Sequence, residues 1–486
     1  MADWIAKLDE LIWGPWLLVL MLGTGIWLML RLEFLPVRRL KFALRCVFGQ
    51  EPERKQRSYN SLKDVSSKGA SGRGVSPFAS LTTELAATIG TGNIVGVATA
   101  MVLGGPGALF WMMAASVLGL ATKLVESTLA VKYHSYNECG ERVGGPMYIL
   151  RTAFPRLSSN SKGYPGRFLA FLYALFAVAA SLGMGNMTQS NSIAEACRVT
   201  FDVPVALSGL VVTIATILVV LGGIGSIAKV TQVLVPVMGI FYLVGTTGVI
   251  LANLERLPVG IGAILVMAFA PEAVTGGFLG NLTATASLSV GQAMRMGVSR
   301  GVFSNEAGLG AAGISAAATD TEDYVRQGYI SMTGVFLDTM IICLVTGLAF
   351  ISSGLIGSTG ADGSLLNGTE LTIAVFEGTY GIWGARFVSV SIILFAFATI
   401  VAWAYQGEKA FEYLMGRTKY NIWYRFGYAL IVFVGAVCSL EMVWNFSDVC
   451  NGLMAVPNLI GVLILSMKPN GICQEIIDYD KQYRGG

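Results

Sequence analysis

Apolar runs long enough to cross a membrane recur along the whole sequence, and they restrict the fold more than any other feature. A helix needs about 20 predominantly apolar residues to span a hydrocarbon core about 30 Å thick. The composition agrees, because the 486 residues are 54% hydrophobic and only 13% charged, whereas soluble domains carry about 25% charged residues. The sequence therefore predicts an all-α integral membrane protein and excludes soluble enzymes, coiled coils and disordered scaffolds.

Charge, cysteine and histidine usage exclude further classes of function. The net charge of +3 argues against a nucleic-acid partner, and the seven cysteines are scattered without a C-x-x-C pair. The single histidine, His134, lies in a polar stretch at residues 132–142, where we expect it to be solvated rather than catalytic. We therefore expect no enzyme activity and no cofactor.

Eleven apolar segments are predicted to span the membrane. The first, at about 13–32, is followed by the most basic stretch, 33–73, which the positive-inside rule places in the cytoplasm. The other ten are predicted at about 76–101, 107–131, 167–195, 203–222, 229–252, 258–286, 329–356, 386–407, 424–440 and 444–467. This count puts the N-terminus outside and the C-terminus in the cytoplasm. It makes cytoplasmic loops of the basic segments 132–167, 295–326 and 408–425, and places 358–386, which is poor in Lys and Arg, outside.

The ten later segments divide into five and five, at 76–252 and 258–467. Because five is an odd number, the second set enters the membrane from the opposite side, which is the geometry of an inverted repeat. We therefore predict an extra N-terminal span and basic loop (1–75), two five-helix repeats (76–255 and 256–467) and a cytoplasmic tail (468–486).

Glycine interrupts the first segment of each set of five. The first interruption runs from Ala86 to Gly96 and contains Gly90 and Gly92, and the second runs from Ala270 to Phe278. Broken helices at matching positions of two halves are the best sequence indication of a transporter's binding site. Close helix packing through the G-x-x-x-G pattern of 92–96 is the alternative.

A helix that unwinds in lipid leaves backbone groups that a ligand can satisfy. N–H groups at the new N-terminus suit a carboxylate, and carbonyls at the end of the preceding half suit a small cation. Thr88, Thr91 and Asn93 add side-chain oxygens to the first break. In the polar patch 183–191, Gln189 can contact cargo or bridge helices. Thr399 can ligate a cation or bond to its own i−4 carbonyl.

Ionisable side chains well inside the predicted spans are few, and we single out Glu84, Lys123, Glu126, Glu272 and Asp338. Charges at this depth are expensive and are functional candidates. Glu84 and Lys123 are predicted at the same depth, so we expect them to form an ion pair. A gating or proton-coupling role for Glu84 is the alternative.

Several motifs resemble the alanine or glycine:cation symporter family, also called the sodium:alanine symporters. The resemblance extends in family order from about residue 13 to 467. It rests on the stretch from Ser76 through Gly92 to Ile94, on Gly104–Met112, on Gly144–Tyr148, on Gly301–Gly310 and on Tyr405–Glu408. It implies a leucine-transporter-like fold of five plus five inverted spans with one extra N-terminal span.

The resemblance also implies roles for individual residues. The substrate carboxylate is expected at Thr88, Gly90, Thr91, Gly92 and Asn93. The rest of the amino acid is expected at Gln189, Thr275, Gly276, Gly277, Phe278 and Trp403. Sodium is expected at the Thr399 hydroxyl with oxygens of Ala86, Ile89 and Asn93.

The chain departs from the family pattern at four positions. Met113 replaces a frequent Trp, and Ala398 replaces a frequent Ser, which removes a possible cation ligand. Glu84 stands where many members have a small residue. Thr88 stands where some glutamine carriers have Arg, which favours a small substrate.

The resemblance implies sodium-coupled inward symport of alanine or glycine by alternating access, in the cell membrane of a prokaryote. Beyond substrate, sodium and lipid, we expect no obligate protein partner. The alternatives are sodium- or proton-coupled symport of another neutral amino acid, such as glutamine or serine, and a channel-like or structural membrane subunit.

Overall fold

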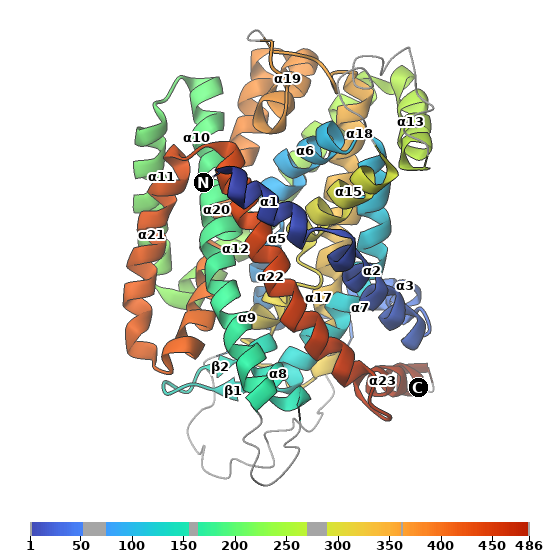
Figure 1. Ribbon diagram of the computed structural model, residues 1–486, viewed down its shortest axis with the longest axis vertical. Coiled ribbons are helices and arrows are strands. Elements are labelled where there is room, and N and C mark those ends of the chain that lie inside the picture. The colour runs from blue at the N-terminus through green and yellow to red at the C-terminus, as the bar shows by residue number, and fades with distance from the viewer. Residues whose placement is uncertain (1, 52–73, 155–163, 270–288, 361–362, 485–486) are drawn as a thin grey trace.

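A computed structural model of the chain describes residues 2–51, 74–154, 164–269, 289–360 and 363–484 (Figure 1). It is built almost wholly of helices. The first half contains α1 (Ala2–Ile12), α2 (Pro15–Arg31), α3 (Leu35–Arg38), α4 (Leu40–Val47), α5 (Pro77–Thr88), α6 (Val95–Leu103), α7 (Gly107–Lys132), α8 (Pro146–Ala153), α9 (Tyr164–Leu182), α10 (Thr188–Phe201), α11 (Val205–Val220) and α12 (Gly223–Ala252). The strands β1 (Ser135–Tyr136) and β2 (Arg142–Val143) pair antiparallel between α7 and α8.

The second half continues the helical bundle. It contains α13 (Leu257–Phe269), α15 (Val290–Asn305), α16 (Ala311–Ala316), α17 (Tyr324–Val335), α18 (Leu344–Ser353), α19 (Gly368–Tyr380), α20 (Ile382–Met415), α21 (Asn421–Val437), α22 (Leu440–Ser466) and α23 (Ile472–Arg484). Short 3₁₀ turns lie at Thr91–Asn93, Leu254–Arg256 and Thr418–Tyr420. The π-helical segments Gly183–Met187 and Phe336–Cys343 join α9 to α10 and α17 to α18.

The protein is a mostly helical membrane protein. Within the described residues, seven continuous helical stretches are long and apolar enough to cross a membrane: Trp4–Arg31, Gly107–Lys132, Pro165–Phe201, Gly223–Ala252, Tyr324–Ser353, Ile382–Met415 and Leu440–Ser466. Helix α11 is apolar but shorter. Only residues 258–269 of the predicted span 258–286 are described, as most of α13.

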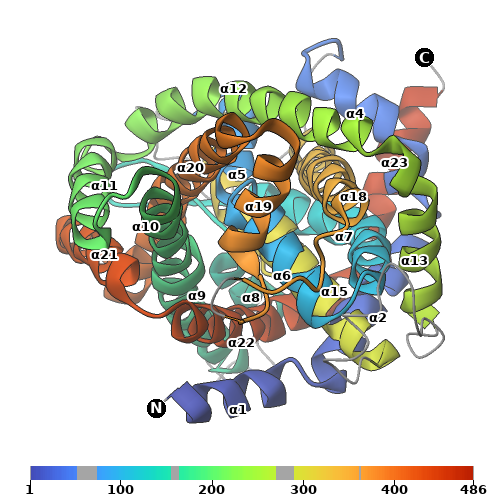
Figure 2. The same ribbon diagram turned by 90° about the horizontal axis from the view of Figure 1, so that it is seen from above.

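The short elements outside the long helices gather at the two ends of the bundle (Figure 1). The β1–β2 hairpin, α8 and the C-terminal α23 lie at one end, whereas α13 and α19 lie at the other. Viewed from above, α5, α6 and α15 lie toward the middle, with α12, α13, α21 and α1 around the outside (Figure 2). Every residue of α5 from Ala79 to Thr88 is buried, and half of these side chains are polar.

The structure corrects the predicted cytoplasmic loop at 295–326. Residues 290–305 form α15, which packs against α6 and α7, and 311–316 form α16. Arg300 is buried because it forms a two-pronged ion pair with Asp448 of α22, with N–O distances of 2.8 and 2.7 Å. The positive-inside rule gives the wrong result here because it counts basic residues alone. It takes no account of Asp448, which neutralises Arg300.

Two further expectations about charged or polar side chains are wrong. His134 is buried rather than solvated, and its Nδ1 lies 2.7 Å from the carbonyl oxygen of Val131. Lys123 does not pair with Glu84. Its ammonium donates to the carbonyl of Asn305 at 2.9 Å, and Glu84 instead accepts a hydrogen bond from Ser331 at 3.0 Å.

Candidate functional site

The first broken helix is present where the sequence predicts it. Helix α5 ends at Thr88, and the chain is extended at Gly90, with φ −135° and ψ −153°. A 3₁₀ turn over Thr91–Asn93 then leads into α6. The Asn93 side chain holds this turn, because its Oδ1 accepts a hydrogen bond from the backbone N–H of Gly90 at 2.9 Å.

A hydroxyl on α20 meets the carbonyls at the end of α5. The Oγ1 of Thr399 lies 3.0 Å from the carbonyl oxygen of Ala86, 3.5 Å from that of Ile89 and 3.1 Å from that of Phe395. Four oxygens from two helices therefore gather around one buried point. Such a group of neutral oxygens suits a small hard cation. The resemblance names three of these residues as cation ligands, and the Phe395 contact is the bond to the i−4 carbonyl that the sequence offers as the alternative for Thr399.

Gly90 lies directly against this oxygen group. A β-carbon at Gly90 would lie 2.4 Å from Thr399 Oγ1 and 3.1 Å from Gln189 Oε1. Gly92 has a similar constraint on its other side, because a β-carbon there would lie 3.1 Å from the ring of Phe303 and 3.3 Å from the α-carbon of Ser304. The alternate glycines thus let the broken helix approach α20 on one face and α15 on the other.

Gln189 bridges two helices. Its Oε1 accepts a hydrogen bond from the backbone N–H of Thr91 at 3.1 Å, and its Nε2 donates to the carbonyl of Met184 at 3.0 Å. The acceptor at Met184 lies in the π-helical segment Gly183–Met187. Widened turns of this kind are frequent at functional sites. The Gln189 amide therefore contacts the first break directly.

The side-chain nitrogen of Asn93 binds a carboxylate, whereas the Thr399 hydroxyl lies among carbonyls. Its Nδ2 donates to Asp338 Oδ1 at 2.6 Å, and Asp338 Oδ2 accepts from Ser304 and Thr339, both at 2.7 Å. Asp338 lies in the second π-helical segment, Phe336–Cys343. The Asn93 amide nitrogen thus donates to Asp338, whereas its oxygen accepts from the N–H of Gly90, the residue that lies against Thr399.

A second broken helix lies between α15 and α16, over residues 306–310. Glu306, Gly308 and Gly310 all have positive φ, at +57°, +93° and +74°. This break abuts the first, since Gly92 packs against residues of α15. The alternate glycines Gly308 and Gly310 repeat the spacing of Gly90 and Gly92, which is the sequence signal for this break. The other predicted break, with Thr275, Gly276, Gly277 and Phe278, lies outside the described residues.

The remaining predicted residues also lie close to the first break. Thr88 donates to the carbonyl of Leu85 at 3.3 Å. Trp403, one turn beyond Thr399 on α20, packs on Gly185, where a β-carbon would lie 2.3 Å from the side chain of Trp403. The Trp403 indole N–H and the Thr91 hydroxyl are both buried without a hydrogen-bond partner among the described residues. Orphaned donors at this depth are unusual.

Aromatic rings and an ion pair close one side of the breaks. The rings of Phe303 and Trp444 stack at 4.7 Å between centroids, and the guanidinium of Arg300 lies 4.4 Å from the Trp444 ring centroid. The guanidinium is also held by Asp448. These side chains join α15 to α22 next to Gly96, where a β-carbon would meet Trp444 at 3.7 Å.

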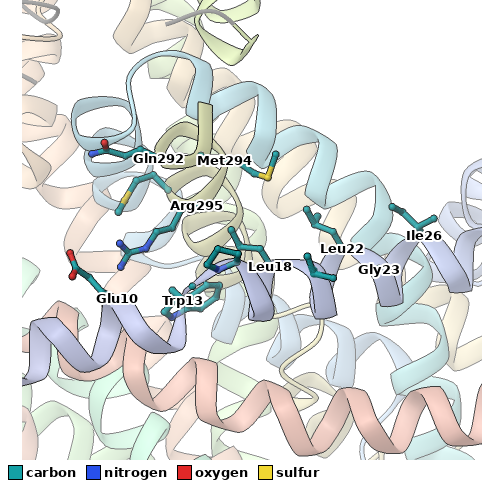
Figure 3. A pocket seen from close by; sticks show the side chains of 14 residues that line it. Glu10, Trp13, Leu18, Leu22, Gly23, Ile26, Gln292, Met294 and Arg295 are labelled. Atoms are coloured by element: carbon teal, nitrogen blue, oxygen red, sulfur yellow. The ribbon is translucent and has the colours of Figure 1, made fainter. Parts of the chain in front are cut away.

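A large groove lies elsewhere on the molecule. It has a volume of about 780 Å³ and lies between α2 and the start of α15. Figure 3 shows Trp13, Leu18 and Leu22 on one side, with Arg295 and Met294 on the other. Most of its lining is apolar. It contains none of the residues around Thr399 or Asp338, so the geometry of the breaks, rather than an open cavity, defines the candidate site.

Known sequences similar to this chain along its whole length include proteins named as sodium-coupled amino-acid symporters. The model of the sodium:alanine symporter family matches residues 1–486. The sodium/alanine symporter AgcS of Methanococcus maripaludis is 43% identical over 95% of this chain and 94% of its own length. The probable sodium/glutamine symporter GlnT of Bacillus subtilis is 34% identical over 98% of this chain and 90% of its own.

Solved structures with a similar fold are transporters. The structure of MhsT with L-phenylalanine matches with a TM-score of 0.58 at 12% identity, over 83% of this chain and 95% of that one. A sodium-coupled sialic acid symporter matches with a TM-score of 0.51 at 12% identity, over 94% and 87%. At this identity the likeness concerns the fold alone, which is that of the leucine-transporter group. From the match over its whole length, the chain belongs to the sodium:alanine symporter family.

Proposed function

We propose that this protein carries alanine or glycine into the cell together with sodium, by alternating access. The observation that carries the proposal is the position of the Thr399 hydroxyl beside the carbonyls of Ala86 and Ile89, where α5 breaks. Helix ends that break at mid-membrane provide carbonyls for a cation and N–H groups for a carboxylate. The relative named as a sodium/alanine symporter supports the same assignment.

We assign the cation and the substrate to adjacent places. Sodium binds the oxygens of Ala86, Ile89, Phe395 and Thr399. The substrate binds between the two breaks, with its carboxylate toward Thr91 and Gly92 and with Trp403 as a wall. Since Gly90 touches Thr399, the substrate and the cation order the same turn, which gives a physical basis for coupling.

We place the chain in the membrane as eleven spans. These are an extra N-terminal span within 1–75, five helices within 76–255 and five within 256–467, followed by the tail 468–486. The sequence predicts that the second five begins with the segment 258–286, and we instead assign its first, broken helix to α15–α16, which matches the broken pair α5–α6. By the positive-inside rule the N-terminus lies outside and the C-terminus in the cytoplasm of a prokaryotic cell.

The sodium gradient is strong enough for accumulation. One charge moving through about 100 mV releases about 2.3 kcal/mol. A tenfold sodium ratio adds about 1.4 kcal/mol. Together they support an alanine ratio of several hundredfold.

Glutamine is a second candidate substrate, because one relative is named a probable sodium/glutamine symporter. The deciding experiment is uptake of labelled L-alanine into proteoliposomes with an inward sodium gradient, in competition with unlabelled glycine, glutamine and serine. We expect strong inhibition by glycine and weak inhibition by glutamine. Uptake that a proton gradient drives equally well without sodium, or that glutamine inhibits better than alanine, contradicts the proposal.

A further inference from the structure

Glu306 carries a buried carboxylate to which no described residue donates a hydrogen bond. It lies at the end of α15, is fully buried, and neither of its carboxylate oxygens has a hydrogen-bond partner among the described residues. The Trp403 indole lies near it, but its N–H makes no properly aligned hydrogen bond. An unpaired carboxylate at this depth is costly and marks a functional site.

The backbone around Glu306 is arranged to leave further acceptors open. The N–H of Ala307 donates to the Asn305 side chain at 2.9 Å, and the N–H of Gly308 donates to Glu126 at 3.4 Å. These N–H groups would otherwise bond to the carbonyls of Phe303 and Ser304, four residues back. The second break therefore gathers carbonyl and carboxylate oxygens in one place.

The backbone conformation of Glu306 itself supports a role for its side chain. Its φ of +57° lies in the left-handed region, which glycine adopts at much lower cost than glutamate. A glycine at this position would relieve that strain, as at Gly308 and Gly310. A strained non-glycine residue at a helix break is a reason to look for function in its side chain.

The other buried carboxylates near Glu306 are already held by the protein. Asp338 accepts from Asn93, Ser304 and Thr339, and Glu126 accepts from Asn458 and Gly308. Glu84 accepts from Ser80 and Ser331 through one oxygen. Lys123 is the basic side chain that faces this group, and it donates to a backbone carbonyl. Lys123 is shared among these four carboxyl groups, so Glu306 has no ion-pair partner of its own among the described residues.

We propose that Glu306 binds the ammonium group of the amino-acid substrate. This inference rests on the proposed function and adds a residue to it. The polar atoms without partners at the two breaks complement a zwitterion. The Thr91 hydroxyl can donate to the substrate carboxylate, and the Glu306 carboxylate can accept from the substrate ammonium group. The two breaks touch at Gly92 and Phe303, so one small zwitterion reaches both.

Sodium is the less suitable occupant of this place. The side chains that act on the Glu306 carboxylate include the donors Trp403 and Lys123 as well as the carboxylates of Asp338 and Glu84. Among the described residues, no shell of carbonyl and hydroxyl oxygens like the one at Thr399 surrounds it. An ammonium group instead makes directed hydrogen bonds to the carboxylate and to the open carbonyls of the break.

The test compares Glu306→Gln with Glu126→Gln. Both substitutions remove a buried carboxylate without a large change in shape, but the Glu126 carboxylate is already satisfied by protein groups. L-Alanine and propionate, which lacks the ammonium group, compete against labelled alanine bound to the purified transporter in sodium. In Glu306→Gln we expect the preference for alanine over propionate to fall by at least about 30-fold, the usual effect of removing one partner of a buried charge pair.

Three controls make the outcome decisive. Glu126→Gln should keep the wild-type preference for alanine over propionate. In thermal melts at increasing sodium, the concentration that gives half of the maximal rise in melting temperature should stay within about twofold of the wild-type value for each variant. Glu306→Asp keeps the charge, so it should keep a preference for alanine even if its absolute affinity falls. An unchanged preference in Glu306→Gln, an equal loss in Glu126→Gln, or a large sodium shift overturns the inference. A wild-type protein that binds no alanine overturns the proposed function as well.

Discussion

Gly90 and Thr399 are in such close contact that no side chain fits between them. A β-carbon on Gly90 would lie 2.4 Å from the Thr399 hydroxyl oxygen. Because this hydroxyl is also 3.0 Å from the carbonyl of Ala86, the contact connects the unwound turn to the proposed cation ligands. A small displacement of α20 from the break would separate both at once.

The first prediction concerns this contact. Gly90→Ala should reduce sodium-dependent alanine uptake at least tenfold and lower stability by about 1 to 3 kcal/mol, the usual cost of overpacking a core. Gly239→Ala is the control, because a β-carbon at Gly239 in α12 would meet nothing within 4 Å. Thermal melts and uptake of each variant check the prediction. Adding Thr399→Ala to Gly90→Ala should restore stability but not sodium dependence.

The second prediction separates the hydroxyl of Thr399 from its methyl group. Thr399→Ala should raise the sodium concentration for half-maximal uptake by about 5-fold to 150-fold, since a buried polar partner is worth about 1 to 3 kcal/mol. Thr399→Ser keeps the hydroxyl and should stay close to wild type. Equal sodium curves for the Ala and Ser variants would rule out a cation at this position.

The first break could be predicted from the sequence because its signals are local. Alternate glycines and three nearby oxygen-bearing side chains lie within residues 86–96, and the structure places the break there. The Thr399 contact depended on family resemblance, because nothing in one sequence shows which helix packs on which.

The second break is harder to predict because basic residues beside it are typical of a cytoplasmic loop. The basic residues Arg295, Arg300 and Arg326 favour a cytoplasmic loop at 295–326, yet Asp9 and Asp448 neutralise the first two from positions 286 and 148 residues away. Long-range ion pairs of this kind have no local signal. The spacing of Gly308 and Gly310 was the available sign, and it matches that of the first break.

A third prediction concerns Gln189. Gln189→Ala removes the acceptor for the Thr91 N–H and the donor to Met184, so it should destabilise the ligand-free protein by about 1 to 3 kcal/mol. We also expect weaker alanine binding, because the unwound turn loses its support. Denaturation with and without alanine distinguishes the two effects. A variant as stable as wild type would show that the bridge contributes nothing to the ligand-free state.

The fourth prediction uses the only histidine of the chain. Burial lowers the pKa of His134, and the nearby Arg142 lowers it further, against the opposing hydrogen bond of its Nδ1 to Val131. The folded protein therefore disfavours the charged form, so stability is lost as the pH falls below the ordinary value of about 6.5. Compared with His134→Gln, the wild-type melting temperature should fall more steeply between about pH 7.5 and 5.5. Parallel curves would contradict this.

The last prediction concerns the buried pair of Arg300 and Asp448. Asp448→Asn removes the carboxylate that pairs with the buried Arg300 guanidinium, and we expect it to destabilise the protein by about 3 to 5 kcal/mol. Replacing both partners, as in Arg300→Met with Asp448→Leu, should cost less than the single change, because no unpaired charge remains.

The exposed pair Arg198–Glu195 is the matched control for this experiment. Its N–O distance of 2.6 Å is as short as in the buried pair, yet solvent screens it, so breaking it should change stability by at most about 1 kcal/mol. A double-mutant cycle in thermal melts gives the coupling energy of each pair. The buried pair should show several times the coupling of the exposed one, because Trp444 and the surrounding helices exclude water from it. Equal coupling would mean that water reaches Arg300 and that this side of the breaks is open in solution.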